Sequence, residues 1–197
     1  MNTQEKIIES ATVLFLEKGF DRTSVREIAS KANINISLMN YYFRSKEILF
    51  ETIIDLLIGK AAASLKDILD AEIDLNEKIS QYTGKYIDML IRNPLLVSFV
   101  LAVLNRNPEK LIKLKVTDNL YTTKKFSQQL NNEYLKGNIK KVDPEQFYLN
   151  MLSLISFPFA MKHLIIEKNQ FSQEEFDRFI TERKEIIYNT LISYLKP

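Results

Sequence analysis

Apolar residues recur every three to four positions along most of the chain, and this spacing is typical of amphipathic helices. Strand-like alternation of apolar and polar residues is absent. The pattern predicts an all-α fold of about nine helices. They are expected near residues 3–18, 24–31, 36–42, 46–70, 75–92, 94–105, 108–136, 144–167 and 173–195.

Capping residues set the expected ends of these helices. Three pairs place a capping side chain before a proline at the first helical position: Asn93-Pro94, Asn107-Pro108 and Asp143-Pro144. Two Ser–Glu pairs, Ser24 with Glu27 and Ser172 with Glu175, have the spacing of a capping box. Gly19 stands where the first helix should end in a left-handed turn.

Residues 24–43 have the pattern of two short helices joined by a tight turn. An apolar face that includes Ile28 and Ala29 is followed by a three-residue break, 33–35, after which the apolar pattern resumes at Met39. Ala29 is small, which suits a close crossing of the second helix, and Asn33 tolerates the positive φ that the turn requires. Asn35 can cap the second helix. The pattern predicts a helix-turn-helix.

The same stretch carries an ordered set of residues that is specific as a whole. The set is Gly19-Phe20, Thr23-Ser24-Val25, Ile28-Ala29, Ala32, Ile34, Met39-Asn40-Tyr41-Tyr42-Phe43 and Ser45-Lys46-Glu47. It resembles the signature of TetR-type transcriptional regulators and covers about the first quarter of the chain. Asn33 replaces the usual Gly, Asn35 the usual Ser or Thr, and Asn40 a frequent Tyr. The last departure bears on which base is read.

The resemblance implies a DNA-binding domain over residues 1–46 and a helical effector-binding and dimerisation domain over 47–197. It implies contacts to base edges of double-stranded operator DNA from Ile36, Ser37, Asn40 and Tyr41. Asn40 suits adenine and Ile36 a thymine methyl group. It further implies contacts to phosphates or flanking positions from Ser24, Arg26, Tyr42, Arg44 and Lys46. Leu38 is equally suited to a DNA contact and to core packing.

The distribution of charge along the chain agrees with this assignment, whereas the net charge does not bear on it. The chain has 27 Lys and Arg against 25 Asp and Glu, a net charge of +2 that by itself does not indicate a nucleic-acid binder. Between Arg22 and Lys46, however, five basic residues face one acidic residue, Glu27. Residues 106–141 hold nine basic and three acidic residues, which we interpret as a solvated helix face, with a secondary DNA contact as the alternative.

Composition excludes several other classes of protein. The chain has no Cys and one His, which leaves no disulfide scaffold, Cys nucleophile or multi-histidine zinc site and suits a reducing compartment, here the cytoplasm. Four Gly leave no glycine-rich phosphate loop. These counts together predict neither a cofactor nor a metal. The longest uncharged stretch, residues 146–161, is too short and too polar to span a membrane.

The carboxy-terminal helices are expected to form a homodimer. The 144–167 pattern is apolar around most of its circumference, so this helix must be covered on both sides, either within one domain or by a second copy. The resemblance implies the second, a four-helix bundle. The expected interface residues are Leu152, Ile155, Phe159, Phe176, Ile180, Ile187 and Leu191.

The effector site is the least defined part of the sequence. Five aromatic residues of the middle helices are candidates for a cavity wall: Tyr82, Tyr86, Phe99, Tyr121 and Phe126. His163, which follows the helix-interior Pro158, is a further candidate, although core packing is the commoner role for each of them. No polar cluster identifies the effector, and an apolar or aromatic small molecule is only the default.

The favoured interpretation is a homodimeric repressor that a small molecule releases from its operator, with the 46–70 helix as the lever between the domains. The sequence does not separate repression from activation. A helical protein-interaction module that keeps the fold without reading DNA is the alternative. An enzyme is disfavoured, because a chain with no Cys and one His offers few groups that could converge as nucleophile and base. The carboxylates Asp67, Asp70 and Glu72 could in principle hold a hard cation, but at a helix end they are more typical of a solvated surface.

Overall fold

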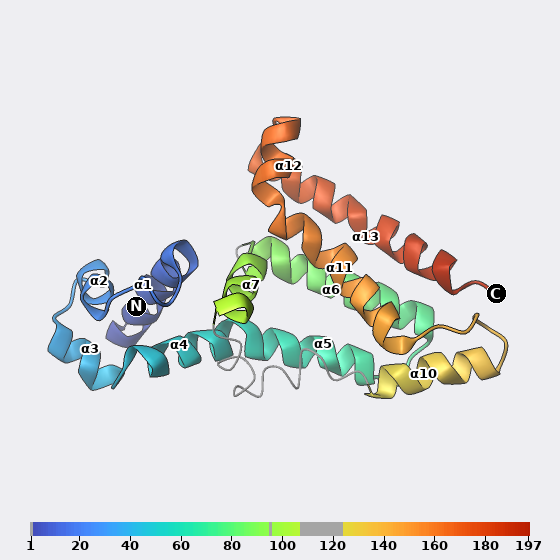
Figure 1. Ribbon diagram of the computed structural model, residues 1–197, viewed down its shortest axis with the longest axis horizontal. Coiled ribbons are helices and arrows are strands. Elements are labelled where there is room, and N and C mark those ends of the chain that lie inside the picture. Colours follow the sequence, from blue (N-terminus) through green and yellow to red (C-terminus); the bar gives the residue numbers. More distant parts are fainter. Residues whose placement is uncertain (1, 95, 107–123) are drawn as a thin grey trace. The chain divides into compact units, whose positions relative to one another are not determined.

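The computed structural model describes residues 2–94, 96–106 and 124–197, and these residues confirm the predicted all-α class (Figure 1). No strand occurs among them. The elements are α1 (Thr3–Lys18), α2 (Val25–Lys31), α3 (Ile36–Tyr42), α4 (Lys46–Ile54), the π-helical η1 (Asp55–Gly59), α5 (Lys60–Asp70), α6 (Leu75–Arg92), α7 (Leu96–Arg106), α10 (Lys124–Leu135), α11 (Pro144–Ala160), α12 (Lys162–Asn169) and α13 (Gln173–Leu195).

The described helices form two compact units. Unit 1 holds residues 2–60 and 98–106, and unit 2 holds residues 61–97 and 124–197. The expected domain boundary after residue 46 falls inside unit 1, because Leu49, Phe50 and Ile53 of α4 are buried there. No single helix in the described ranges is long and apolar enough to cross a membrane; the bent pair α11–α12 meets the length and composition test when both helices are taken together.

The helices of unit 1 begin where their capping side chains stand. Ser24 and Glu27 form the predicted capping box of α2. Asn33 adopts the expected positive φ of 54°, and the Asn35 side chain accepts the Leu38 N–H at 2.7 Å. Asn2 and Glu5 form a further capping box that starts α1. The predicted helix-turn-helix is therefore confirmed by its own turn geometry.

Aromatic rings make up much of the core of unit 1. The ring centroid of Phe50 lies 5.2 Å from that of Phe15, 4.7 Å from that of Phe20 and 5.7 Å from that of Phe99. These rings come from α1, the α1–α2 connection, α4 and α7. Their contacts explain why unit 1 extends past the helix-turn-helix, since α4 and part of α7 complete its core.

The helix expected over residues 46–70 is interrupted. Five residues, Asp55–Gly59, form a π-helical turn between α4 and α5. A Cβ atom at Gly59 would lie 2.7 Å from Oδ1 of Asp55, so the absence of a side chain at residue 59 leaves room for the Asp55 carboxylate. π-helical turns inside α-helices cannot be predicted from a 3.6-residue apolar period.

Unit 2 is built around α6, which packs against both α11 and α13 (Figure 1). Lys78 of α6 is 2% exposed, and its ammonium group donates to the carbonyl of Leu69 at the end of α5. Burial lowers the pKa of Lys78. Asn93 was predicted to cap a helix that starts at residue 94, and this prediction is wrong. Asn93 instead follows the end of α6, and α7 begins at Leu96.

The carboxy-terminal apolar helix is also broken. The 144–167 pattern corresponds to α11 and α12, which meet at Met161 at an angle of 60°. Pro158 lies in the last turn of α11 and accounts for the break, because it provides no N–H for the carbonyl four residues earlier. Asp143 caps α11 as predicted by accepting the Gln146 N–H. Of the helix expected over 108–136, residues 107–123, including Asn107-Pro108, lie outside the described residues.

Candidate nucleic-acid interface

Helix α3 presents two chemically different faces within unit 1. Its inner side is held by Met39, which is 1% exposed, and by Phe43 directly after the helix. The four residues expected to contact bases all lie on the outer side. Ser37 and Asn40 are exposed, Ile36 is 41% exposed and Tyr41 is 80% exposed. Such exposure is unusual for a large aromatic side chain, and Tyr41 contacts mainly the edge of the neighbouring Tyr42 ring. Leu38 is half-buried.

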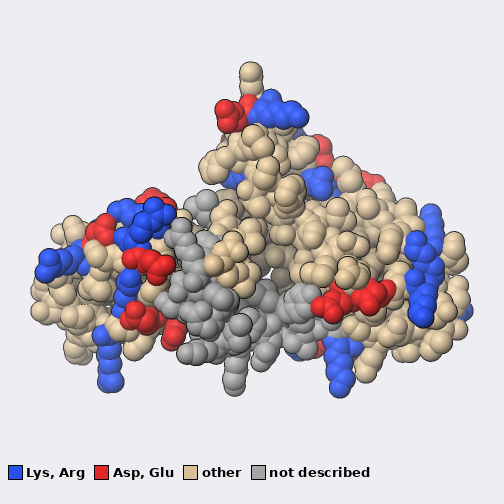
Figure 2. Space-filling view, viewed as in Figure 1, with Lys and Arg blue, Asp and Glu red and all other residues tan. Residues whose placement is uncertain are grey.

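The basic residues at either end of the helix-turn-helix are open to solvent. Arg22, Arg26, Lys31 and Arg44 are exposed, and none of them forms an ion pair with a described residue. Figure 2 shows acidic as well as basic side chains on the visible face of unit 1. The positive character therefore belongs to the segment 22–46 and not to unit 1 as a whole.

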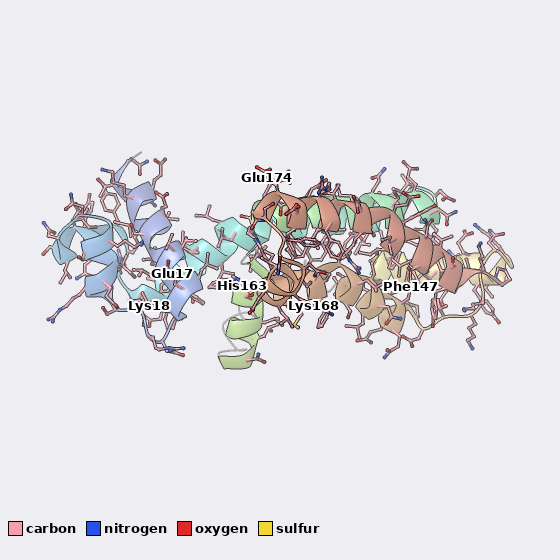
Figure 3. The ribbon with its side chains drawn as sticks, turned by 90° about the horizontal axis from the view of Figure 1, so that it is seen from above. Glu17, Lys18, Phe147, His163, Lys168 and Glu174 are labelled. Atoms are coloured by element: carbon pink, nitrogen blue, oxygen red, sulfur yellow. The ribbon has the colours of Figure 1, made fainter. Side chains whose placement is uncertain are left out.

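The single carboxylate of this segment is neutralised locally. Glu27 accepts a hydrogen bond from Lys18 at 2.7 Å and further bonds from the backbone N–H and the hydroxyl of Ser24. These bonds, with that of Lys18 foremost, lower the pKa of Glu27 to about 2. Because Lys18 lies at the end of α1 (Figure 3), outside the segment, it compensates Glu27 without using any of the segment's own cations.

Lys46 is only partly available to a phosphate. Its ammonium group donates to the carbonyls of Phe20 and Thr23, both at 3.0 Å, and lies 4.1 Å from the centroid of the Phe20 ring. An ammonium group has three donors, so one N–H remains. Lys46 thus connects the start of α4 to the α1–α2 connection, a contact between residues 23 and 26 positions apart that the sequence did not reveal.

The proposed flanking contact at Ser24 is also engaged internally. Its hydroxyl group caps α2 and bonds to Glu27, so the side chain has a structural role in the free protein. Tyr42 is 39% exposed and follows Tyr41 on the outer side of α3. Of the residues expected at phosphates or flanks, Arg26 and Arg44 are the ones that the structure leaves fully exposed and without an ion pair.

The candidate effector residues do not form one wall. Tyr82 and Tyr86 of α6 lie together, and the Tyr82 hydroxyl is 3.1 Å from that of Tyr148 on α11. Burial raises the pKa of Tyr82 well above its ordinary value and that of Tyr86 to about 12. Tyr86 as a whole is half-buried, and its hydroxyl group lies at the buried end of the side chain.

The other effector candidates lie elsewhere. Phe126 packs on Phe147 in the core of unit 2, and Phe99 belongs to unit 1 through its contact with Phe50. His163 lies exposed on α12 (Figure 3). Tyr121 is outside the described residues. Only the pair of tyrosines therefore remains as a candidate polar cluster, with Tyr148 added by the fold.

The expected dimer-interface residues require correction. Six of the seven are between 0% and 2% exposed within the single chain: Ile155, Phe159, Phe176, Ile180, Ile187 and Leu191. They form the core of unit 2 and offer almost no surface to a second copy. Leu152 is half-buried. The apolar stripes were identified correctly, but α11 and α13 pack against each other and against the protomer's own α6, and the sequence pattern alone could not distinguish these helices from a partner's.

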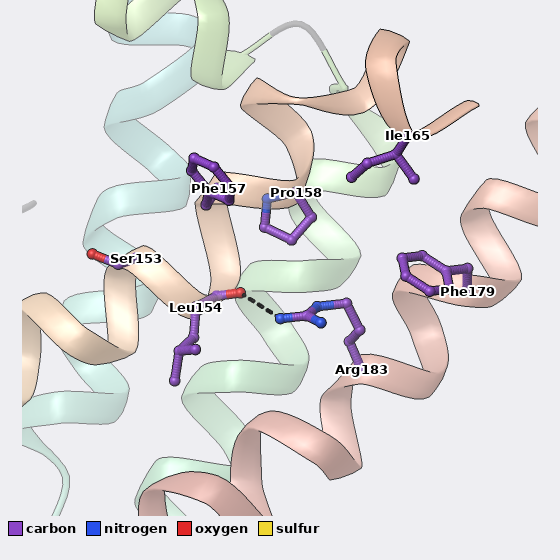
Figure 4. Close-up of a pocket in the computed structure, with 7 residues that line it drawn as sticks. All are labelled: Ser153, Leu154, Phe157, Pro158, Ile165, Phe179 and Arg183. Carbon is purple, nitrogen blue, oxygen red and sulfur yellow. Dashed lines mark hydrogen bonds between the residues drawn. The ribbon is translucent and has the colours of Figure 1, made fainter. Parts of the chain in front are cut away.

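Sequence reasoning missed two residues of unit 2. In the sequence, Tyr148 was distinguished only by its hydroxyl group within an otherwise apolar helix, so nothing indicated its contact with Tyr82. Arg183 did give one, because it interrupts the apolar stripe of α13 four residues after Phe179 and four before Ile187. Its guanidinium group donates to the carbonyl of Leu154 on α11 at 3.5 Å (Figure 4).

A short helix with an exposed polar face and buried inner face, following a capped partner helix and a positive-φ turn, defines a helix-turn-helix DNA-binding protein. Residues 7–53 match the family model described as bacterial regulatory proteins, tetR family. This match, together with the fold, identifies residues 7–53 as a DNA-binding domain of the TetR type.

Similar proteins agree with the assignment. The probable HTH-type transcriptional regulator YttP of Bacillus subtilis (strain 168) is 50% identical over 54 residues, 27% of this chain and 26% of that protein. The biofilm operon icaADBC HTH-type negative transcriptional regulator IcaR of Staphylococcus aureus (strain Newman) is 25% identical over 201 residues, 98% of this chain and 99% of that protein. The transcriptional regulator FadR from Bacillus subtilis, solved in complex with stearoyl-CoA, is similar in fold, with a TM-score of 0.70, 16% identity and coverage of 97% and 98% of the two chains.

Proposed function

We propose that the chain binds double-stranded operator DNA through the outer face of α3 and represses transcription. The observation that carries this proposal is the exposure of Ile36, Ser37, Asn40 and Tyr41 on a helix that is anchored in the core by the buried Met39. Two of these side chains are large and apolar, so a partner that covers them on binding gains from their desolvation. The match of residues 7–53 to the tetR family supports DNA as that partner.

The four residues have complementary roles in this proposal. Asn40 offers the donor and acceptor pair that suits the adenine edge, and Ile36 an apolar contact for a thymine methyl group. Arg26 and Arg44 neutralise backbone phosphates and fix the register of α3 in the major groove. The remaining N–H of Lys46, at the N-terminus of α4, supplies a further phosphate contact.

Two copies are proposed to act together. One α3 of seven residues covers only a few base pairs, so two linked half-sites raise both affinity and specificity. The apolar side chains that remain exposed on α11 and α13, among them Leu149 and Ile186, are the candidates for burial between copies. Ile186→Asp is expected to shift the chain toward monomer in sedimentation equilibrium, and an unchanged association constant would argue against this face.

Regulation by a small molecule completes the proposal. FadR from Bacillus subtilis is similar in fold and was solved with stearoyl-CoA, and IcaR is named a negative regulator, which supports a ligand-responsive repressor. A regulator that binds DNA is proposed to act in the cytoplasm. In unit 2, the buried hydroxyl groups of Tyr82 and Tyr148 are the candidate polar contacts for the effector. A ligand can act only if it binds the DNA-competent and the released forms with different affinity.

The test begins with selection of a preferred duplex from a randomised double-stranded library, followed by titration at several salt concentrations. Asn40→Ala is expected to weaken binding to the selected duplex by about 1–3 kcal/mol and to leave binding to an unrelated duplex unchanged. Arg44→Ala is expected to weaken both duplexes alike and to flatten the salt dependence by about one unit per contact.

A matched control lies in the other unit. Arg178 on α13 is also an exposed arginine, and Arg178→Ala should change neither affinity nor salt dependence. Recovery of no preferred sequence, or an Asn40→Ala effect that is equal on every duplex, would refute base reading by α3. Equal effects of Arg44→Ala and Arg178→Ala would refute the assigned phosphate contact.

A further inference from the structure

The connection between α1 and α2 is a tight turn that hydrogen bonds hold at both ends (Figure 1). The N–H of Thr23 donates to the carbonyl of Phe20 at 3.3 Å, and the Thr23 hydroxyl group donates to the carbonyl of Gly19 at 2.8 Å. Thr23 itself is 1% exposed. The two residues between these ends, Asp21 and Arg22, have exposed side chains. Their backbone is therefore fixed while their side chains face solvent.

Lys46 anchors the same turn to the start of α4. Its ammonium group donates to the carbonyls of Phe20 and Thr23, one at either end of the turn, at 3.0 Å each. Consecutive Cα atoms are about 3.8 Å apart, so the side chain of Arg22 starts within one residue of a group that Lys46 contacts. The chain runs through α2 and α3 between these two cations, so only the fold brings them together.

The guanidinium group of Arg22 has no partner within the described part of the chain. It forms neither an ion pair nor a side-chain hydrogen bond there, and the neighbouring Asp21 does not pair with it. The carboxylate of Glu27 is already bonded to Lys18. A guanidinium group has five N–H donors in a planar fork that matches the oxygens of a phosphate. Exposed arginines are common on protein surfaces, and Arg22 is distinguished by its fixed backbone and its place beside Lys46.

We propose that Arg22 binds a phosphate of the operator backbone next to the phosphate that Lys46 contacts. The proposal rests on the proposed binding of operator DNA by α3, and it adds a positioning residue that none of the sequence-based assignments included. Each strand of DNA carries one phosphate charge per about 3.4 Å of helix axis, so neighbouring phosphates can pair with two cations held close together. Such contacts fix the register of the protein on the duplex and carry no sequence information.

Replacement of single phosphates tests the contact directly. In the selected duplex, the phosphates around each half-site are exchanged one at a time for methylphosphonate, which keeps the backbone and removes the charge. The unaltered chain is expected to lose about tenfold in affinity at the position that Arg22 contacts, since a charge-assisted hydrogen bond is lost there. The Arg22→Gln variant should bind the unmodified duplex about tenfold more weakly and show almost no further loss at that position.

A matched control lies in the same segment. Lys31, at the end of α2, is also an exposed cation without an ion pair, and Lys31→Gln should change neither the affinity nor the methylphosphonate profile. Arg22→Gln should flatten the salt dependence by about one unit per contact, whereas Arg22→Lys should keep it. Neither variant of Arg22 should change Tm, because the side chain makes no contact within the described protein.

Two results would overturn this contact alone. Equal effects of Arg22→Gln and Lys31→Gln would show that Arg22 acts only through net charge. An undiminished loss by Arg22→Gln at every methylphosphonate would show that no phosphate pairs with it. Failure of the proposed function differs from both, because the unaltered chain would then select no duplex and Asn40→Ala would have no selective effect. That outcome would overturn the Arg22 contact as well.

Discussion

Lys46 provides the sharpest test of how the DNA-binding unit is held together. Replacing it with Met keeps the aliphatic part of the side chain and removes only the ammonium group. The carbonyls of Phe20 and Thr23 then lose their donor, and the Phe20 ring loses the cation 4.1 Å from its centroid. The α1–α2 connection, which leads directly into the capping residue Ser24, is no longer tied to α4.

The size of the effect follows from these contacts. A hydrogen bond to a charged group contributes about 1.5–3 kcal/mol, and a cation–π contact about 0.5–1 kcal/mol. Lys46 is half-buried, so water can partly replace it at both carbonyls. We therefore expect Lys46→Met to lower the free energy of unfolding by about 2–3 kcal/mol, which corresponds to a Tm lower by roughly 4–12 °C for a chain of this length.

Two measurements distinguish a structural role of Lys46, in which it ties the α1–α2 connection to α4, from a phosphate contact. They are thermal unfolding followed by circular dichroism and DNA binding over a series of salt concentrations. Arg44→Met is the control, because Arg44 is an exposed cation nearby with no ion pair and should change the salt dependence without lowering Tm. A phosphate role alone would flatten the salt dependence of Lys46→Met by about one unit per contact and leave its Tm unchanged. An unchanged Tm would refute the bracing role that the two 3.0 Å hydrogen bonds indicate.

Three further predictions concern single residues. Gly84→Ala should raise the free energy of unfolding by about 0.5–1 kcal/mol in urea titration, because the added Cβ lies inside α6 and meets no atom within 4 Å; a loss of stability would contradict this. For Glu27 the pKa in the folded chain, about 2, lies below its ordinary value of 4.5, so its contribution is present above pH 4.5 and is lost as the pH falls to 2. The difference in urea midpoint between Glu27→Gln and the unaltered chain should therefore shrink over that interval, and a gap independent of pH would disprove the linkage. In a spectrophotometric titration, Tyr86→Phe should remove an ionisation near pH 12, since burial raises the pKa of Tyr86, and a titration curve unchanged in that range would contradict the assignment.

Local chemistry determined the elements that the sequence predicted well. The capping box at Ser24, the turn at Asn33 and the cap at Asn35 depend on neighbours within a few residues, so each could be predicted from its own short segment. The outer face of α3 followed in the same way. Once Met39 and Phe43 are assigned to the core, helical geometry places Ser37 and Tyr41 on the opposite side of the helix. The helical period did not predict the exposure of Ile36, because Ile36 lies three residues before Met39.

Contacts between distant segments decided the rest. An apolar stripe shows that Ile155 and Ile180 are buried, but only the packing of α11 and α13 on α6 shows that their own chain covers them. The sequence position of Lys46 is compatible both with a phosphate contact and with hydrogen bonds to the carbonyls of Phe20 and Thr23, and only the fold reveals these hydrogen bonds. Periodicity describes which side of a helix is apolar, whereas its partner is determined by the free energy of the whole packed chain.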